Sequence, residues 1–226
     1  MRVIIGHDHR EPEATRVALK SLRKFGIEGE VLATPKLRAQ GLFWRPEDTR
    51  GGQRYDFTSQ APCATEFSNS RFLTPILGTG FVLFVDADVV FLGDPRALLT
   101  EIKSEHAVSV VKHPHGLQAP GRKMDNQVQT AYDRKNWSSV MLFNCDHPAN
   151  RRLSLRDVNE RPGRDLHAFY WLHDEEIGEL WKGWNWLVGE QPRPQPLLIA
   201  HFTLGGPFTP GWLGGPHDEI WLEAAR

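Results

Sequence analysis

The sequence has few cysteines. Only Cys63 and Cys145 occur among its 226 residues. Two cysteines are too few for a disulfide scaffold, and these two lack the CxxC spacing of a zinc or thiol-redox site. We therefore expect two packed thiols.

Long apolar runs and an excess of charge are also missing. Only Val3-Ile4-Ile5 precedes the first polar turn, which is too short for the core of a signal peptide, and no later run approaches a membrane span. The net charge is -1, so no overall field attracts the chain to duplex nucleic acid or to an anionic membrane. These absences predict a soluble, cytoplasmic protein in which any contact with a polyanion is local.

The glycine-rich fingerprint of dinucleotide-binding folds is absent as well. A strand is predicted over residues 2–6, then a helix that Pro12 begins and Gly26 ends, then a second strand over residues 27–32. This β-α-β opening favours a parallel sheet. Its turn contains only Gly6 where the fingerprint requires GxGxxG.

The most informative stretch is Phe81–Val85, an unbroken apolar run that leads directly into Asp86 and Asp88. A short run of this kind predicts a strand that is buried on both faces of a sheet. Because charges are costly inside such a strand, the two aspartates are expected at its carboxyl end. In open α/β sheets, ligands bind at that edge.

The remaining chain predicts a single α/β domain over residues 1–226, with a mostly parallel central sheet flanked by helices. Residues 34–62 lack a sustained period and predict an irregular excursion. Helices are predicted over 65–77 and, from an N-cap at Asp94, over 95–102. Further predictions are strands over 107–111, 137–144 and 196–202, a mobile loop over 113–135, and a final helix capped by Asp218.

Asp86 and Asp88 have the spacing of a metal site. Side chains at i and i+2 of an extended chain point to the same side, so both carboxylates can bind one hard divalent cation. Oxygen ligands suit Mg²⁺ or Mn²⁺, and the imidazole of His201, which ends a later apolar strand, favours Mn²⁺. Such an ion would stabilise charge on a phosphate leaving group. Alternatively, the aspartates only cap a turn and His201 is an ordinary histidine at a strand end.

These residues resemble a known family. Asp86-Ala87-Asp88 after a buried strand is similar to the DxD motif of GT-A glycosyltransferases, and the order of elements resembles glycosyltransferase family 8. The resemblance implies a GT-A-like, Rossmann-like domain, with a nucleotide-binding half over residues 1–105 and a sugar- and acceptor-binding half over 106–226. It implies sugar transfer from a nucleotide diphosphate sugar, a UDP-sugar, to an acceptor hydroxyl with retention of anomeric configuration.

The resemblance also implies a role for residues at matching positions. Mn²⁺ or Mg²⁺ would be held by Asp86, Asp88 and His201, and Asp174 would lie near the reacting carbon. The implied donor contacts are Ile5, Gly6, His7, Asp8, Arg10, Arg71, Ala87 and Gly205, and the implied sugar or acceptor contacts are Asn144 and Trp212.

The chain departs from the family pattern in three places. Glu175 stands where the family has glutamine, His201 is about one residue farther from Gly205, and Thr209 stands near the position of a phosphate-binding lysine. Charge on a diphosphate would then be balanced by the metal, Arg71, and Arg10 or Lys123. Asp174 would act as the nucleophile of a double displacement, or would stabilise the sugar cation while the acceptor attacks from the leaving-group face.

Two other classes of function fit parts of the pattern. An apolar strand followed by Asp-x-Asp-x-Val also matches haloacid dehalogenase-like phosphatases, in which Asp86 would be phosphorylated, although such proteins usually place the motif near the N-terminus. A non-catalytic nucleotide-sugar or glycan binding module is the third reading. For a transferase, basic residues over 150–164 and at Arg122 and Lys123 would tolerate a glycan, a lipid-linked glycan or a modified nucleic acid as acceptor.

Overall fold

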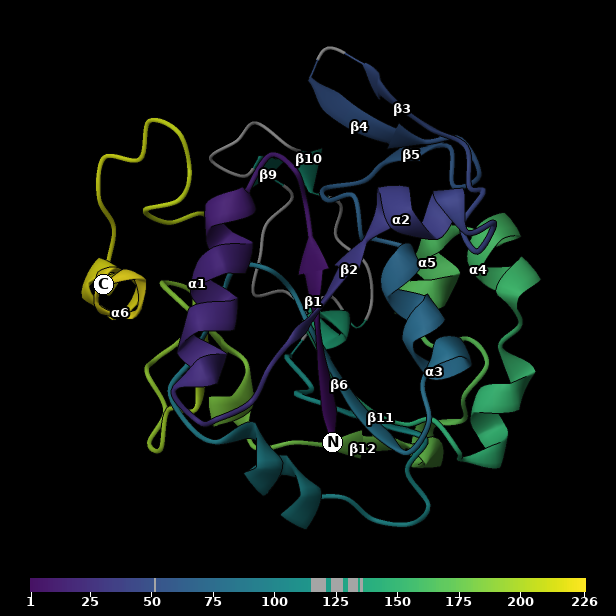
Figure 1. Ribbon diagram of the computed structural model, residues 1–226. Coiled ribbons are helices and arrows are strands. Elements are labelled where there is room, and N and C mark those ends of the chain that lie inside the picture. The colour runs from purple at the N-terminus through teal and green to yellow at the C-terminus, as the bar shows by residue number, and fades with distance from the viewer. Residues whose placement is uncertain (51, 115–120, 123–127, 130–133, 135) are drawn as a thin grey trace.

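The computed structural model describes residues 1–50, 52–114, 121–122, 128–129, 134 and 136–226. Its centre is a six-stranded sheet with the order β12-β8-β11-β6-β1-β2 (Figure 1). The strands are β1 (Arg2–His7), β2 (Glu30–Ala33), β6 (Phe81–Val85), β8 (Val108–Val110), β11 (Val140–Asn144) and β12 (Ile177–Glu179). The predicted mobile loop over 113–135 lies mostly outside the described residues. Within it, the described strands β9 (Gly121–Arg122) and β10 (Val128–Gln129) form a short antiparallel pair.

Five of the six strands run in the same direction. β1 pairs in parallel with β2 and β6, β12 pairs in parallel with β8, and β11 is antiparallel to both β6 and β8. The predicted mostly parallel sheet is therefore confirmed. Strands from residues 1–105 and from residues 106–226 share this one sheet, so the two halves of the chain are joined by hydrogen bonds through its middle.

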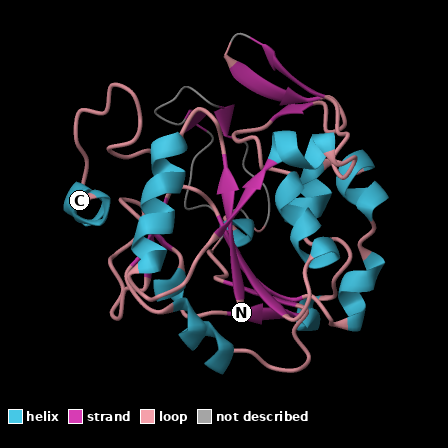
Figure 2. Ribbon diagram, in the orientation of Figure 1, coloured by secondary structure: helices cyan, strands magenta, loops and turns pink. Residues whose placement is uncertain are grey.

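Helices cover both faces of the sheet (Figures 1 and 2). They are α1 (Pro12–Arg23), α2 (Thr34–Ala39), α3 (Thr74–Leu77), α4 (Leu155–Glu160), α5 (Gly163–His167) and α6 (Asp218–Ala225), with 3₁₀ helices η1 (Ser70–Leu73), η2 (Pro95–Thr100), η3 (Trp137–Ser139), η4 (Pro148–Arg152), η5 (Asp174–Glu176) and η6 (Lys182–Trp184). Among the described residues no helix has the length and apolarity needed to cross a membrane.

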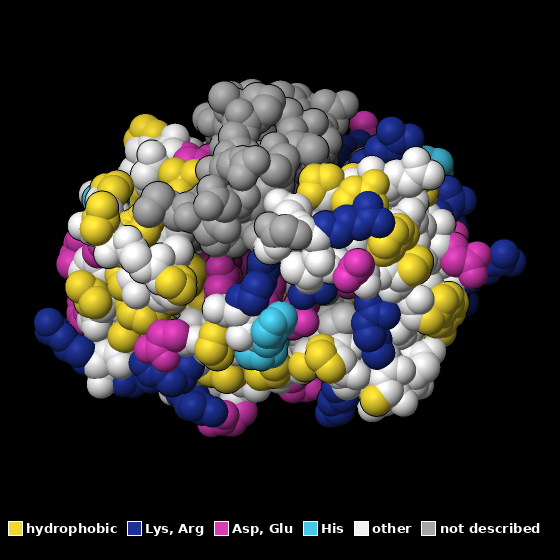
Figure 3. Space-filling model, turned by 90° about the horizontal axis from the view of Figure 1, so that it is seen from above, with side chains coloured by type: hydrophobic (Ala, Val, Ile, Leu, Met, Phe, Trp, Pro, Cys, Tyr) yellow, Lys and Arg dark blue, Asp and Glu magenta, His cyan; other side chains and the backbone are white. Residues whose placement is uncertain are grey.

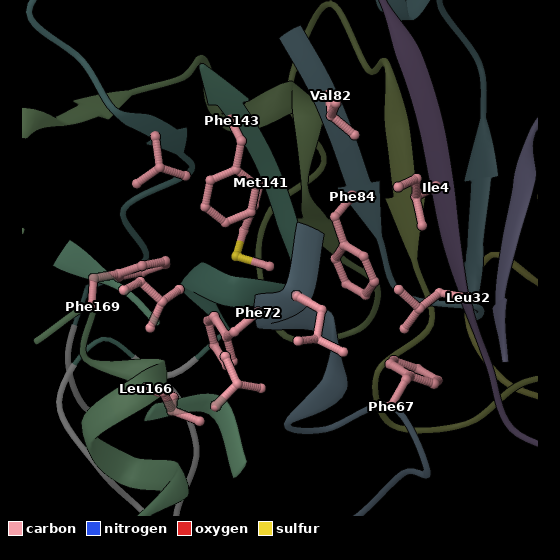
Figure 4. Close-up of a cluster of buried hydrophobic side chains, with 14 of the residues drawn as sticks. Ile4, Leu32, Phe67, Phe72, Val82, Phe84, Met141, Phe143, Leu166 and Phe169 are labelled. Atoms are coloured by element: carbon pink, nitrogen blue, oxygen red, sulfur yellow. The ribbon is translucent and has the colours of Figure 1, made fainter. Parts of the chain in front are cut away.

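Alternate residues of the central strands enter two separate cores, as the period of a strand requires. Ile4, Phe84 and Phe143 face the side covered by η1, α3, α4 and α5, where they meet Phe72 and Leu166 (Figure 4). Their chain neighbours, among them Ile5, Val85 and Leu142, pack on the opposite side against α1 and η2. The central strands are thus apolar along their length because both faces are buried.

The chain leaves the main sheet after Val85 and enters a second sheet directly after Asp88. β7 (Val89–Phe91) pairs with β14 (Ile199–His201), which pairs with β13 (Trp186–Leu187) in a second, three-stranded sheet. The register places His201 opposite Val89. This sheet packs against α1 and α6 through its own apolar cluster. The two aspartates therefore stand at the passage between two sheets.

Residues 34–62 are more ordered than their composition predicted. They form α2 and an antiparallel sheet of β3 (Glu47–Arg50), β4 (Gln53–Asp56) and β5 (Ala61–Pro62). Most side chains of β3 and β4 are polar and incompletely buried, so the strands carry no alternating apolar pattern that sequence reasoning could detect.

Two predicted helix boundaries were also wrong. Residues 65–69 form turns, and the helical part begins only at Ser70 as η1 and continues directly as α3, whose first turn accommodates Pro75. Leu77, expected on the buried face, is 44% exposed. His217, not Asp218, is the N-cap of α6; the Asp218 carboxylate accepts hydrogen bonds from the Trp212 indole and the Gly215 backbone.

A buried ion pair anchors the β3-β4-β5 sheet to the rest of the domain. Arg45 and Asp56 are both fully buried, with Arg45 Nη2 2.6 Å from Asp56 Oδ2. Arg45 Nη1 also donates to the carbonyl of Val158 on α4, and Nη2 donates to the Ser59 hydroxyl. Removing the arginine would leave Asp56 charged in a dry environment.

We expect Arg45→Leu to lower the free energy of unfolding by about 3–5 kcal/mol, because it leaves a buried carboxylate without its cation. Chemical denaturation measures the change. The matched control is Arg23→Leu, which breaks the exposed pair with Glu28 and should cost below about 1 kcal/mol. The double variant Arg45→Leu, Asp56→Leu should recover part of the loss; equal losses for Arg45→Leu and Arg23→Leu would contradict the anchoring role.

Candidate functional site

The sequence Asp86-Ala87-Asp88 lies at the carboxyl edge of the main sheet, directly after β6. Ala87 is buried in the core, while the Asp86 backbone N–H donates to the Ser139 carbonyl at 2.9 Å. The carbonyl of Asp88 accepts from the Phe202 N–H, also at 2.9 Å. Backbone hydrogen bonds thus hold the motif to the last residue of η3 on one side and to the residue that follows β14 on the other.

Asp86, Asp88 and His201 meet at this edge. A carboxylate oxygen from each aspartate and one ring nitrogen of His201 all lie within 4.8 Å of one another. His201 Nε2 is 3.2 Å from Asp88 Oδ1, and His201 is only 2% exposed. Figure 3 looks onto the end of the molecule at which β1 finishes, where acidic, basic and histidine side chains gather beside the atoms drawn in grey.

The donor set of this cluster fits a divalent cation. Two carboxylates supply hard oxygen ligands, and one imidazole supplies a borderline nitrogen ligand, which together suit Mn²⁺ and admit Mg²⁺. The cluster contributes three ligands, which leaves coordination positions for other groups. The structure therefore brings together the three residues that the sequence singled out as metal ligands.

Arg71 lies beside the cluster and is buried. Its Nη1 donates to Asp86 Oδ1 at 2.7 Å and to the Ser138 carbonyl at 2.8 Å. The guanidinium also stacks against the rings of Phe67 and Phe84. Arg71 Nε is buried and makes no hydrogen bond within the described chain. This cation balances one of the two carboxylates.

The end of β1 provides the second part of the predicted donor site. Ile5 is fully buried, and a Cβ on Gly6 would come within 2.5 Å of the Phe67 ring, so packing alone requires glycine there. His7 Nδ1 lies 3.0 Å from the Thr15 hydroxyl at the start of α1. These contacts fix the first turn of the fold at the same edge as the aspartates.

Asp8 and Arg10 form a charged pair within that turn. Arg10 Nη2 lies 2.8 Å from Asp8 Oδ2, and the N–H of Glu66 donates to the same carboxylate. Burial on its own raises the pKa of Asp8, but the hydrogen bonds and charge of Arg10 outweigh it and hold the pKa below its usual value. Arg10 also binds the Ala64 carbonyl, so its charge is already committed within the fold.

A second group of potential ligands, Asp8, His9 and Glu66, lies in this turn. Its carboxylates already have cationic partners: Arg10 contacts Asp8, and Arg54 Nη2 is 3.3 Å from Glu66 Oε1. This group is therefore a salt-bridge network. It has no need of a metal ion to balance its charge.

Asn144 is not brought to the cluster. It pairs with Phe81, the first residue of β6, and so lies at the opposite edge of the sheet. Asp174 begins η5, just before β12, and its side chain is 85% exposed and forms an ion pair with Arg134. The role assigned to each of these residues stays a prediction.

The loop after β14 is held by its own contacts. The Trp212 indole donates to the Asp218 carboxylate, and buried Thr209 accepts from the Gly206 N–H, so Thr209 closes this loop. Gly205 has φ +113°, a conformation that favours glycine. Trp184 and Trp186 are core residues.

Sequence reasoning missed the polar residues behind the cluster. His201 Nδ1 is 2.9 Å from Asn185 Oδ1, and the Asn185 amide donates to the Ser139 hydroxyl. His113 is buried near His201, with its Nδ1 3.1 Å from Gln191 Nε2. His113 follows a predicted strand, as His201 does, so the signal that identified His201 was present for it as well.

The burial of His113 makes stability depend on pH. Desolvation, with a smaller contribution from His201, lowers the pKa of His113 to about 4. The unfolded chain, in which the histidine pKa is about 6.5, therefore takes up a proton first, so stability is fully present above that value and falls as pH drops towards 4.

We expect the free energy of unfolding to fall between pH 7 and pH 4, with His113 contributing about 2–3 kcal/mol of the loss. Urea denaturation at each pH measures the slope. His113→Gln should reduce the number of protons taken up on unfolding by about one, which makes the unfolding free energy depend less on pH, whatever the stability of the variant at pH 7. An unchanged slope in His113→Gln would count against a neutral, buried imidazole.

Comparison with solved structures shows which known proteins share this fold. The chain superposes along 100% of its length on the galactosyltransferase LgtC, solved with donor and acceptor sugar analogs, with a TM-score of 0.58 and 13% identity over 95% of that chain. It covers 59% of the glycosyltransferase GlyE of Streptococcus pneumoniae, with a TM-score of 0.56 and 15% identity. A glycosyltransferase involved in glycosylation of the major capsid of PBCV-1 gives 0.53 and 12% identity over 97% of its length.

A sequence relative is closer. Protein CDI of Arabidopsis thaliana is 39% identical over 233 residues, covering 98% of this chain and 85% of that protein. No family model matches the sequence. The chain has the α/β fold of GT-A glycosyltransferases, and it belongs to the family of the Arabidopsis Protein CDI.

Proposed function

We propose that the chain is a metal-dependent glycosyltransferase related to glycosyltransferase family 8, which moves a sugar from a UDP-sugar to an acceptor hydroxyl with retention. The observation that carries this proposal is the convergence of Asp86, Asp88 and His201 at the carboxyl edge of the sheet. The same edge holds the buried Arg71 and the end of β1, where ligands of α/β sheets bind. The shared GT-A fold is the second support.

In this proposal each group has a distinct task. A bound Mn²⁺ or Mg²⁺ would supply Lewis-acid stabilisation of the diphosphate leaving group. Asp86, Asp88 and His201 would hold the ion, while Arg71 keeps Asp86 in place and adds positive charge at the same edge. Residues Ile5 to Asp8 would contact the nucleotide.

Thr209 stands near the position where glycosyltransferase family 8 has a phosphate-binding lysine. Its hydroxyl accepts a hydrogen bond that closes the loop after β14, so its role is structural. Arg10 forms its ion pair with Asp8, whereas Arg71 forms an ion pair with Asp86 of the candidate metal site. In the proposed site the metal ion would therefore balance most of the diphosphate charge, and Arg71, which is paired with Asp86, would add positive charge at the same edge. Lys123 lies outside the described residues.

The acceptor is proposed to be a glycan or a lipid-linked glycan. The basic segment over 150–164 offers little free positive charge for a nucleic acid, because most of its arginines are paired with acidic neighbours. These pairs are Arg152–Glu176, Arg156–Glu160, Arg161–Asp157 and Arg164–Asp165. This segment is a solvated helix face.

Nucleotide binding tests the proposal. We expect UDP to bind in the presence of Mn²⁺ and to lose at least tenfold in affinity when Mn²⁺ is omitted or when Asp86→Asn or Asp88→Asn removes a charged ligand. Isothermal titration calorimetry measures each case. Asp94→Asn is the matched control, because Asp94 is the half-buried N-cap of η2 and the substitution should leave UDP affinity unchanged.

Two outcomes would replace the proposal. Metal-independent binding of UDP, or of a glycan, that survives both substitutions would favour a non-catalytic binding module. Release of phosphate from simple phosphomonoesters, with no binding of UDP, would favour a phosphatase in which Asp86 is the nucleophile. If UDP binding depends on Mn²⁺ and on both aspartates, a panel of nucleotide sugars, assayed by release of the nucleoside diphosphate, identifies the donor.

The catalytic role assigned to Asp174 needs its own test. Because its carboxylate is exposed and paired with Arg134, we expect Asp174→Asn to change the rate of sugar transfer less than about tenfold. The rate is measured at saturating donor, with UDP affinity as a control for folding. A loss of about a thousandfold with normal UDP affinity would instead restore Asp174 as a catalytic residue.

A further inference from the structure

The polar contacts behind His201 form a continuous network. Asn185 is fully buried, two residues before Leu187, which is the partner of His201 in the parallel pairing of β13 with β14. Its Oδ1 lies 2.9 Å from His201 Nδ1. Its Nδ2 donates to the Ser139 hydroxyl at 2.9 Å and to the Asn136 carbonyl at 3.2 Å.

The surroundings of Asn185 fix which way its amide points. The Asn136 carbonyl accepts hydrogen bonds and cannot donate one. The Ser139 hydroxyl already gives its proton to that same carbonyl, at 2.6 Å. Both groups therefore require a donor from Asn185, which is the amide NH₂. The amide oxygen is left facing the imidazole.

An oxygen acceptor at Nδ1 determines the state of the His201 ring. Nδ1 must carry a proton to donate to Asn185 Oδ1, so the neutral ring keeps its lone pair on Nε2. Nε2 is the ring nitrogen that faces Asp88. A histidine binds a metal through the nitrogen that lacks a proton, and its other nitrogen usually donates to a nearby acceptor that also orients the ring.

The same network reaches the first aspartate. Ser139, whose hydroxyl accepts from Asn185, offers its carbonyl to the Asp86 N–H. Its neighbour Ser138 offers its carbonyl to Arg71, which binds the Asp86 carboxylate. One short segment before β11 thus connects the backbone of Asp86 with the partner of His201.

We infer that Asn185 is a positioning residue that sets the tautomer and ring orientation of His201 and, through Ser139, ties this ring to the backbone at Asp86. The metal-binding consequence rests on the proposed function, whereas the tautomer does not. Asn185 touches neither metal nor substrate in this role. It acts only through His201.

The first test is the tautomer of His201 in the metal-free protein. Long-range ¹H–¹⁵N spectra at pH 8 to 9 should report a protonated Nδ1 in the wild type. In Asn185→Leu the ring loses its acceptor, and the proton should move to Nε2, beside Asp88. Asn185→Asp keeps an oxygen at this position and should retain the protonated Nδ1. An unchanged spectrum in a folded Asn185→Leu protein overturns the inference.

The second test is the affinity for Mn²⁺ alone, measured from the electron paramagnetic resonance signal of the free ion. We expect Asn185→Leu to weaken binding 10- to 100-fold, the effect typical for a residue that orients a metal-binding histidine. Asn185→Asp should weaken it less. Thermal unfolding without metal provides the measure of any general damage to the fold.

A double-variant cycle separates positioning from structural damage. If Asn185 acts through His201, adding Asn185→Leu to His201→Ala should weaken Mn²⁺ binding no further. Equal losses in both backgrounds would show that Asn185 acts by another route. If the wild type binds no Mn²⁺, the metal part of the proposed function fails, while the tautomer result still decides the role of Asn185.

Discussion

The structure depends on how two carboxylates are accommodated at the end of an apolar strand. β6 is buried on both faces, and a charge that follows such a strand is costly unless partners meet it there. Arg71 approaches Asp86 from η1, and His201 approaches Asp88 from the second sheet. The Ser139 carbonyl, just before β11, and the Phe202 N–H, just after β14, bind the peptide groups of the two aspartates. Each partner is positioned by a different part of the chain, so the contacts that hold the two aspartates also connect these parts of the fold.

Much of this could be predicted from the sequence, because the central strands are continuous apolar runs and Asp86 interrupts such a run. The parallel sheet, the place of both aspartates at its edge and the strand that ends in His201 all follow from this pattern. The pattern was weak over β3 and β4, where most side chains are polar and incompletely buried. There, antiparallel pairing and the buried pair of Arg45 with Asp56 supply an order that has no period in the sequence.

The residues around the site were harder to predict, because their positions depend on register. Asn144 ends a strand and was expected among the sugar or acceptor contacts, but β11 runs antiparallel to its neighbours, so its last residue lies at the far edge. The same reversal brings the residues before β11, Ser138 and Ser139, to the aspartates. Because this one strand is reversed, the aspartates lie beside the residues before β11 and not beside the residue at its end. Sequence periodicity shows where a strand ends but not its direction.

The passage of the chain between two sheets at Asp88 affects the order of folding. Asp88 and His201 are separated by half the length of the chain, and closing so long a loop has an entropic cost that local contacts must meet first. During synthesis, the main sheet has all its strands once β12 has emerged, whereas β14 emerges later. The carboxyl edge of the main sheet is consequently completed only after the strands of that sheet have all emerged. A partly made protein would hold its core without its cluster of ligands.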